Sequence, residues 1–254
     1  MSRKLFPFAV ILAVFLGAAF APGQSEDPKA RELVRKIDDL YRSDSSYARI
    51  EMEIVTPDWR RTLALKGWTQ GQSKTLIRIL EPKKEAGIGT LRLGNEMWNY
   101  LPKTDKVIKI PPSMMMSSWM GSDFTNDDLV RGSSLVEDYE AKVLGVEKAG
   151  EREVWRIGLT PKPDSPVVWG KVEMLVDRQS CLPVKQVFFD EEGKEARRLE
   201  YGDFRQVGWR QFPARMTFIP SDENRQTSIL YDQIEFDLDI SDDTFGLHRL
   251  RQGR

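Results

Sequence analysis

The chain has 254 residues, and its 38 lysine and arginine residues nearly balance its 39 aspartate and glutamate residues, for a formal net charge of −1. This balance argues against a nucleic-acid-binding protein, which would carry an excess of basic residues. Apolar residues make up 40% of the chain, enough for one large core, and no linker or internal repeat divides it.

The N-terminus has the pattern of a secretory signal, because Arg3 and Lys4 precede an apolar run from Leu5 to Phe20. Cleavage after Ala21 and cleavage nearer Ser25 both fit. We assign residues 1–25 to the signal peptide and residues 26–254 to a single exported domain. The alternative is an uncleaved membrane anchor, although the run is shorter than the roughly 20 apolar residues that a spanning helix needs. Cleavage would leave 36 basic and 39 acidic residues, a formal charge of −3.

Residues 27–42 predict one amphipathic helix. Asp27 can act as its N-cap, and Pro28 suits the first turn. The helical spacing places one apolar face on the helix, formed by Leu33, Ile37, Leu40 and Tyr41. We expect this face to pack against a sheet; a lid over a cavity is the alternative.

From Ser46 onward the apolar residues recur with a period of two, which is typical of β-strands. Glycine-containing turns follow at short intervals and indicate an antiparallel meander. Several strands are apolar on both faces, so we expect a mainly β protein with one strongly curved antiparallel sheet and helices across its mouth. The expected strands lie near residues 46–56, 59–69, 73–81, 88–94, 96–101, 106–110, 137–147, 152–160, 167–177, 183–190, 195–204, 212–219 and 226–238.

The strand pattern is interrupted between Pro111 and about Gly132, and loops of this length are usually functional. The interruption is rich in adaptable apolar side chains, and we expect these to line a lid or cavity that contacts a ligand. Asp123 or Thr125 could cap a short helix that runs through Leu129. The apolar candidates are Met114, Met115, Met116, Trp119, Met120 and Phe124.

The residues needed for common catalytic and metal centres are scarce. His248 is the only histidine and Cys181 the only cysteine, which argues against a catalytic triad, a zinc site or an internal disulfide. We interpret Cys181 as a packing residue. Asp123, Asp127 and Asp128 could suggest calcium, but their spacing is not that of an EF-hand and suits helix capping. No catalytic residue, cofactor or metal is therefore assigned.

Three lysines, Lys103, Lys106 and Lys109, follow one another near the strand expected at 106–110. We expect them to lie on one strand face. Such a face could contact anionic headgroups or an acidic partner; an ordinary solvated face is the alternative.

The stretch MWNYLPKTDKVIKIPPSMMMSSWMGSDFTNDDL, from Met97 to Leu129, resembles the outer-membrane lipoprotein-sorting family related to the periplasmic carrier LolA. The most specific elements are residues 98–102, 106–110, 121–125 and 127–129. Weaker agreement extends through residues 78–82 and the later pair 182–185 and 193–194. The methionine triplet departs from the family pattern, where more polar or mixed residues are expected.

This resemblance implies an incomplete β-barrel around an apolar cavity with a helical lid, in a periplasmic protein. It implies a carrier of lipoprotein acyl chains or phospholipid between the inner and outer membranes, with transient contact at membrane surfaces. Members of this branch look like companions of RND-type inner-membrane exporters. Trp98 and Tyr100 join the methionine segment as candidate ligand contacts. The alternative is a non-carrying accessory module that docks on an envelope transporter; nothing in the chain supports an enzyme.

Overall fold

The computed structural model describes residues 27–40, 43–131, 135–163, 165, 167–221 and 224–252. The expected signal peptide and Tyr41 of the expected helix lie outside these residues. In the described part of the chain, no helix has the length and apolar character needed to cross a membrane. The helices are α1 (Pro28–Asp38), η1 (Pro112–Met114), α2 (Asn126–Arg131), α3 (Leu135–Asp138), η2 (Asp242–Phe245) and α4 (Leu247–Gln252).

Thirteen strands form one antiparallel sheet, which confirms the mainly β meander. The strands are β1 (Ser45–Val55), β2 (Arg60–Gln70), β3 (Lys74–Glu81), β4 (Gly89–Leu93), β5 (Glu96–Leu101), β6 (Lys106–Lys109), β7 (Tyr139–Ala149), β8 (Arg152–Pro161), β9 (Lys171–Asp177), β10 (Pro183–Phe189), β11 (Glu195–Val207), β12 (Arg210–Pro220) and β13 (Gln226–Phe236).

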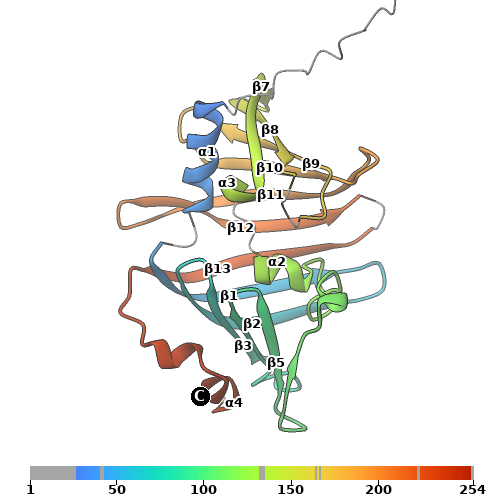
Figure 1. Cartoon of the computed structure of the whole chain (residues 1–254), viewed down its shortest axis with the longest axis vertical. Coiled ribbons are helices and arrows are strands. Elements are labelled where there is room, and N and C mark those ends of the chain that lie inside the picture. Colours follow the sequence, from blue (N-terminus) through green and yellow to red (C-terminus); the bar gives the residue numbers. More distant parts are fainter. Residues whose placement is uncertain are drawn as a thin grey trace, which may run out of the picture.

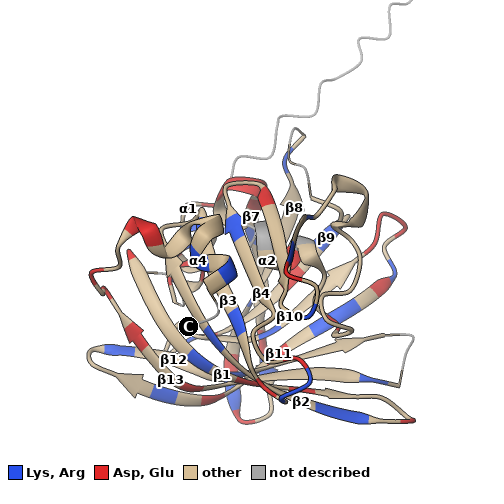
Figure 2. Cartoon of the chain, turned by 90° about the horizontal axis from the view of Figure 1, so that it is seen from below, with Lys and Arg blue, Asp and Glu red and all other residues tan. Residues whose placement is uncertain are grey.

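Strands that follow one another in the chain pair with each other, apart from β6 and β7. In addition, the first strand, β1, pairs with the last, β13. The order β6-β5-β4-β3-β2-β1-β13-β12-β11-β10-β9-β8-β7 therefore places β6 and β7, which are consecutive in sequence, at the two opposite edges. The sheet is bent but not closed into a barrel, and in Figure 2 strands β1, β2, β12 and β13 form its floor. The crossing segment, residues 110–138, has to span from one edge to the other.

Helix α1 confirms the expected amphipathic helix but ends at Asp38, earlier than Arg42. The Asp27 carboxylate accepts hydrogen bonds from the backbone N–H groups of Lys29 and Ala30, at 2.9 and 3.4 Å. The buried residues of α1 are Ala30, Leu33, Val34 and Ile37. They pack on the concave face of the sheet, on the same side as α2 and α3 (Figure 1).

Two apolar clusters lie on opposite faces of the β3–β5 region. The inner cluster contains the α1 residues, Met97, Trp119 and Phe124. The outer cluster is formed by Leu76, Leu91, Tyr100, Phe245 and Leu250. Since side chains alternate along a strand, Met97 and Tyr100 of β5 point to different faces.

The outer cluster is covered by the C-terminal elements η2 and α4, which the sequence pattern does not predict. Arg78 of β3 is buried beneath them and donates to the carbonyl oxygens of Arg249 and Leu250, at 3.0 and 2.9 Å. These bonds satisfy carbonyl groups at the end of α4 that have no partner within the helix. The single histidine, His248, lies on α4 and is exposed.

Two expected strand starts are wrong. Strand β9 begins at Lys171, and residues 167–170, expected as its first part, are not in a strand. Strand β7 begins at Tyr139 because α3 occupies the residues just before it. Residues 167–169 are apolar and residues 137–138 directly adjoin the alternating residues of β7, so the apolar pattern alone does not mark these boundaries.

Candidate functional site

A cavity of about 250 Å³ lies between the concave face of the sheet and α2. One part of its lining is apolar, and comes from β1, β2, β3, β13 and α2. The other part is polar and includes Ser46, Thr69, Gln72, Thr75 and Arg92. The apolar lining residues are Ala48, Ile50, Ile77, Leu129, Tyr231 and Ile234.

Tyr231 contributes a phenol to this lining, and burial raises its pKa to about 12. The phenol therefore remains neutral at physiological pH. The cavity has the composition of many small-molecule sites, mostly apolar with a few polar groups. At 250 Å³ it is smaller than the roughly 300–1,000 Å³ of typical ligand pockets.

The crossing segment contains a compact turn that we call the anchored loop, Ser118–Phe124. It is closed by a hydrogen bond from the backbone N–H of Trp119 to the carbonyl oxygen of Phe124, at 2.7 Å. Met120 and Gly121 have left-handed φ values of 53° and 76°, which let the chain reverse. Trp119 is 2% exposed, and its indole N–H donates to Thr90 Oγ1 at 3.1 Å. The loop is thus part of the core.

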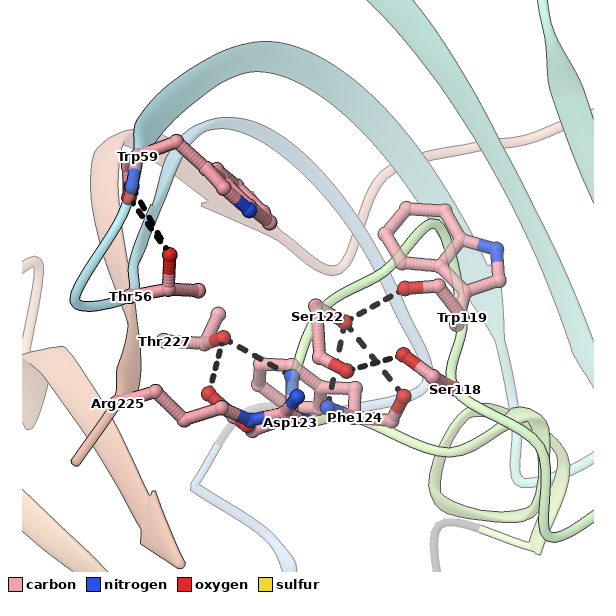
Figure 3. Close-up of polar contacts among 9 residues, drawn as sticks. All are labelled: Thr56, Trp59, Ser118, Trp119, Ser122, Asp123, Phe124, Arg225 and Thr227. Atoms are coloured by element: carbon pink, nitrogen blue, oxygen red, sulfur yellow. Dashed lines mark hydrogen bonds and ion pairs between the residues drawn. The ribbon is translucent and has the colours of Figure 1, made fainter. Parts of the chain in front are cut away.

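The anchored loop is fixed to the sheet through Asp123 (Figure 3). Thr227 Oγ1 donates to the Asp123 carboxylate at 2.6 Å and accepts from the Asp123 backbone N–H at 2.9 Å. Arg225 forms an ion pair with the same carboxylate. From β2, Arg61 donates to the carbonyl oxygen of Met120 at 2.9 Å. The loop is therefore held by both halves of the sheet.

Helix α2 begins with reciprocal capping between Thr125 and Asp128. The Asp128 backbone N–H donates to Thr125 Oγ1 at 3.0 Å, and the Thr125 backbone N–H donates to Asp128 Oδ2 at 2.8 Å. This is the capping-box arrangement, with aspartate at the third helical position. It confirms Thr125 as the cap of the expected short helix; Asp123 does not cap it, and the helix extends to Arg131.

Asp128 also forms the main ion pair between α2 and the sheet. Arg197 of β11 donates to its two carboxylate oxygens at 2.8 and 2.6 Å. Burial alone would raise the pKa of Asp128, but the hydrogen bonds and charge of Arg197, together with Thr125, outweigh it and hold that pKa below its ordinary value. Asp128 therefore remains ionised and keeps the pair intact.

Arg197 is an unusual residue for a concave apolar face, because it is only 7% exposed. Its guanidinium group stacks on the rings of Trp169, Phe188 and Phe218, at 4.6, 4.7 and 5.1 Å from their centroids. Its Nε has no hydrogen-bond partner. A buried cation in such surroundings depends strongly on the anion that pairs with it.

The structure brings only some of the sequence-predicted residues together. Trp119, Met115, Met120 and Phe124 pack in the inner cluster, and Phe124 lies against Phe218 with ring centroids 4.2 Å apart. Met114 and Met116 are 48% and 47% exposed. None of these six side chains lines the cavity.

Trp98 and Tyr100 lie apart from the anchored loop, in the outer cluster beneath α4. They share a face with each other but not with Met97, as the period of two requires. The expected common face of the three lysines is also wrong. Lys106 and Lys109 have opposite parity on β6, and Lys103 lies in the preceding turn. Lys109 pairs with Glu96.

The carboxylates that could suggest a calcium site have other partners. Asp123 binds Arg225 and Thr227, and Asp128 binds Arg197; the side chain of Asp127 is not described. Among the described residues, no group of three or more His, Cys, Asp or Glu side chains is placed to hold a metal ion. Cys181 packs against the inner cluster as a free thiol.

Sequence reasoning missed the residues that matter most to the cavity. Arg197 lies 69 positions from Asp128, and no local pattern links the two. The spacing Thr125-x-x-Asp128 could have marked the start of α2. Ile50 and Ile77 were recognised only as members of alternating strands, because a sequence does not show which strand residues face a void.

The model of a family described as "Uncharacterized protein" matches residues 71–252. No curated protein matches this sequence. Among solved structures, a DUF1329 family protein from Desulfovibrio piger aligns with a TM-score of 0.80 at 21% identity, over 87% of this chain and 98% of that one.

Two further solved structures share the fold. A protein described as an outer membrane lipoprotein-sorting protein domain, from Vibrio parahaemolyticus, aligns with a TM-score of 0.77 at 20% identity, over 88% of this chain and 99% of that one. A LolA superfamily protein from Nitrosomonas europaea aligns with a TM-score of 0.73 at 20% identity, over 87% and 98%. The chain therefore belongs to the family whose model matches residues 71–252, and it shares the bent-sheet fold of the lipoprotein-sorting domain and of the LolA superfamily protein.

Proposed function

We propose that this protein is a periplasmic carrier that shelters acyl chains of lipoproteins or lipids and moves them between the inner and outer membranes. The observation that carries the proposal is the apolar cavity on the concave face, closed on one side by α2. The likeness of the fold to that of a protein described as a lipoprotein-sorting domain supports a carrier over an enzyme. Fold alone does not fix function, so the proposal depends on the cavity.

The cavity chemistry suits a reversible carrier. Burying about 10 methylene groups at about 0.8 kcal/mol each gives roughly 8 kcal/mol, which corresponds to a micromolar site before ordering costs. Such an affinity allows both uptake and release.

Helix α2 is the part of the crossing segment that moves in this proposal. It supplies Asp128 and Leu129 to the cavity lining, and the cavity is too small for a long acyl chain while α2 stays in place. The anchored loop remains fixed, because Trp119 and Asp123 are buried in the core and bonded to the sheet. The lid is thus α2 alone and does not include the methionine-rich segment, Met114–Met120.

The expected location and partners complete the proposal. Export through the signal peptide would place residues 26–254, as one domain, in the periplasm. The protein would receive cargo from an inner-membrane transporter, with an RND-type exporter as the expected partner, and contact membrane surfaces only transiently.

Native mass spectrometry of the protein purified from the periplasm tests the carrier. We expect co-purified lipid or acylated peptide at one molecule per chain, and its loss after replacement of Ile50 by aspartate on the cavity wall. The matched control is Ile108→Asp, on the exposed edge strand β6. Reproducible absence of bound lipid from the unaltered protein would contradict a carrier.

A groove of about 500 Å³ favours the second candidate, a non-carrying module that docks on an envelope transporter. Its lining includes three lysines, Lys83, Lys84 and Lys103, apolar residues such as Ile88 and Leu101, and Glu85, whose carboxylate pairs with Arg61. This surface could bind an acidic partner segment.

A pull-down of the transporter separates the two functions. It compares a Lys83→Glu/Lys84→Glu variant with the unaltered protein, each with and without bound lipid. The docking module is favoured if the lysine variant fails to pull down the transporter and if bound lipid has no effect on the pull-down by the unaltered protein.

A further inference from the structure

We propose that Arg197 is the headgroup site of the cargo and that the cargo is an amphiphile with an anionic carboxylate or phosphate group. This inference rests on the proposed carrier function and specifies its substrate class. In the structure, which we take as the closed state, the carboxylate of Asp128 occupies the place that the cargo headgroup would take.

The first step of the argument is the cost of opening. Any movement of α2 that enlarges the cavity withdraws Asp128 from Arg197. The guanidinium would then lose this anion and remain among the rings of Trp169, Phe188 and Phe218. An uncompensated buried charge is strongly unfavourable, so the open state needs a replacement anion.

The second step is the geometry of Arg197. It presents both terminal nitrogens to one carboxylate, a fork that matches carboxylates and phosphates equally well. Its Nε, also buried, has no partner with Asp128 in place. A phosphate with more acceptor oxygens could satisfy this donor as well.

The third step is continuity. Asp128 is both the partner of Arg197 and a lining residue of the cavity. A headgroup that takes over its position would therefore have its acyl chain directed into the space lined by Ile50, Ile77 and Ile234. Anion and chain would be bound in one continuous site.

The test compares probes that share a chain and differ in headgroup: palmitate, hexadecyl phosphate and hexadecanol, with inorganic phosphate as the anion without a chain. We expect the full-length mature protein to bind the two anionic probes roughly tenfold or more tighter than hexadecanol. Inorganic phosphate should show no binding in the same concentration range.

The decisive variant is the double replacement Arg197→Met/Asp128→Leu, which removes both charges together. Replacing both members of a buried pair by apolar residues is commonly tolerated, whereas Arg197→Met alone would leave Asp128 unpaired. With its folding checked by circular dichroism, this variant should bind hexadecanol at least as well as the unaltered protein and lose the preference for anions. Arg198→Met, the neighbouring residue on the opposite face, should keep the preference.

The outcomes separate the two proposals. Equal affinity for palmitate and hexadecanol, or an anion preference that survives in the double variant, overturns the headgroup site and leaves the carrier standing. Binding of inorganic phosphate as tight as that of hexadecyl phosphate also overturns it, in favour of a free-anion site. Absence of binding by all three chain probes overturns the carrier as well.

Discussion

Trp119 and Trp209 have opposite environments, with exposed fractions of 2% and 83%. Trp119 fills the inner cluster and donates to Thr90, whereas Trp209 lies in the turn between β11 and β12. We expect Trp119→Ala to lower the free energy of unfolding by about 3–5 kcal/mol, as large-to-small core replacements do. Chemical denaturation measures this difference.

Trp209→Ala is the matched control, and we expect it to change the free energy of unfolding by no more than about 0.5 kcal/mol. A small effect of Trp119→Ala would show that the anchored loop is loosely held. In that case the whole methionine-rich segment, and not α2 alone, would be the lid.

Asp128 gives a second prediction at the residue scale, which concerns pH. Because the pKa of Asp128 is held below its ordinary value of 3.8 in the folded state, its stabilising contribution is complete above that value and is lost as the pH falls below it. We expect Asp128→Asn to cost about 3 kcal/mol, the lower end for a broken buried pair, since a fifth of the Asp128 side chain is exposed.

Denaturation at a series of pH values checks both parts. The stability difference between the unaltered protein and Asp128→Asn should be constant from pH 7 to about 5 and shrink below about pH 4. A difference that already falls between pH 7 and 5 would mean that another titrating group controls the attachment of α2.

Residue identity in the crossing segment was predictable only in part. Trp119 and Phe124 were expected to line a lid or cavity that contacts a ligand; in the structure both are buried in the core and neither lines the cavity. The composition of the triplet Met114–Met116 predicted contact with a ligand. In the structure its members alternate in exposure along the turn that contains η1. The Asp128–Arg197 pair depends on the packing of β11 under α2, which no local pattern contains.

At the scale of elements, the C-terminal helix α4 has no counterpart among the elements that the sequence pattern predicts. Its apolar residues are too few for a periodic signal, and its stability comes from Arg78 and the outer cluster. Leu250 is fully buried there, and a Cβ added at Gly89 would lie 2.7 Å from its Cδ1. The fit of α4 on β4 is therefore close.

We expect Leu250→Ala to lower the free energy of unfolding by about 2–5 kcal/mol and to leave palmitate affinity unchanged, because the outer cluster lies on the far side of the sheet from the cavity. Thermal unfolding and a palmitate titration measure the two effects. Leu247→Ala on the same helix, where the side chain is half-exposed, should leave both nearly unchanged. A loss of palmitate affinity in Leu250→Ala would show that the two faces are coupled.

The strand meander was predictable because both of its signals are local: a period of two and glycine-containing turns. Thirteen strands were expected, and the described part of the chain has thirteen, most within a few residues of their expected bounds. The pairing of β1 with β13 was not predictable, since it joins the two ends of the meander. The sequence also does not show which face of the sheet is concave, because strands such as β5 carry apolar residues on both faces.

For the whole molecule, the pairing of β1 with β13 has a consequence that hydrogen exchange can detect. This pair lies in the middle of the sheet, joins its two halves, and is flanked by β2 and β12. Amides there should exchange only through global unfolding and be the slowest in the protein. The lid helix α2 has six residues and is attached mainly through Asn126 and Asp128, so its amides should exchange through local opening.

Palmitate binding should therefore change exchange unevenly along the crossing segment. If α2 alone moves, exchange should increase at residues 126–131, while the anchored loop, Ser118–Phe124, keeps its protection through Asp123 and Thr227. Asp128→Asn without palmitate should reproduce the increase in α2, with β1 and β13 unchanged. A parallel increase across both α2 and the anchored loop would contradict the division into a fixed loop and a moving helix, because the bonds from Thr227 and Arg61 would then have to break as well.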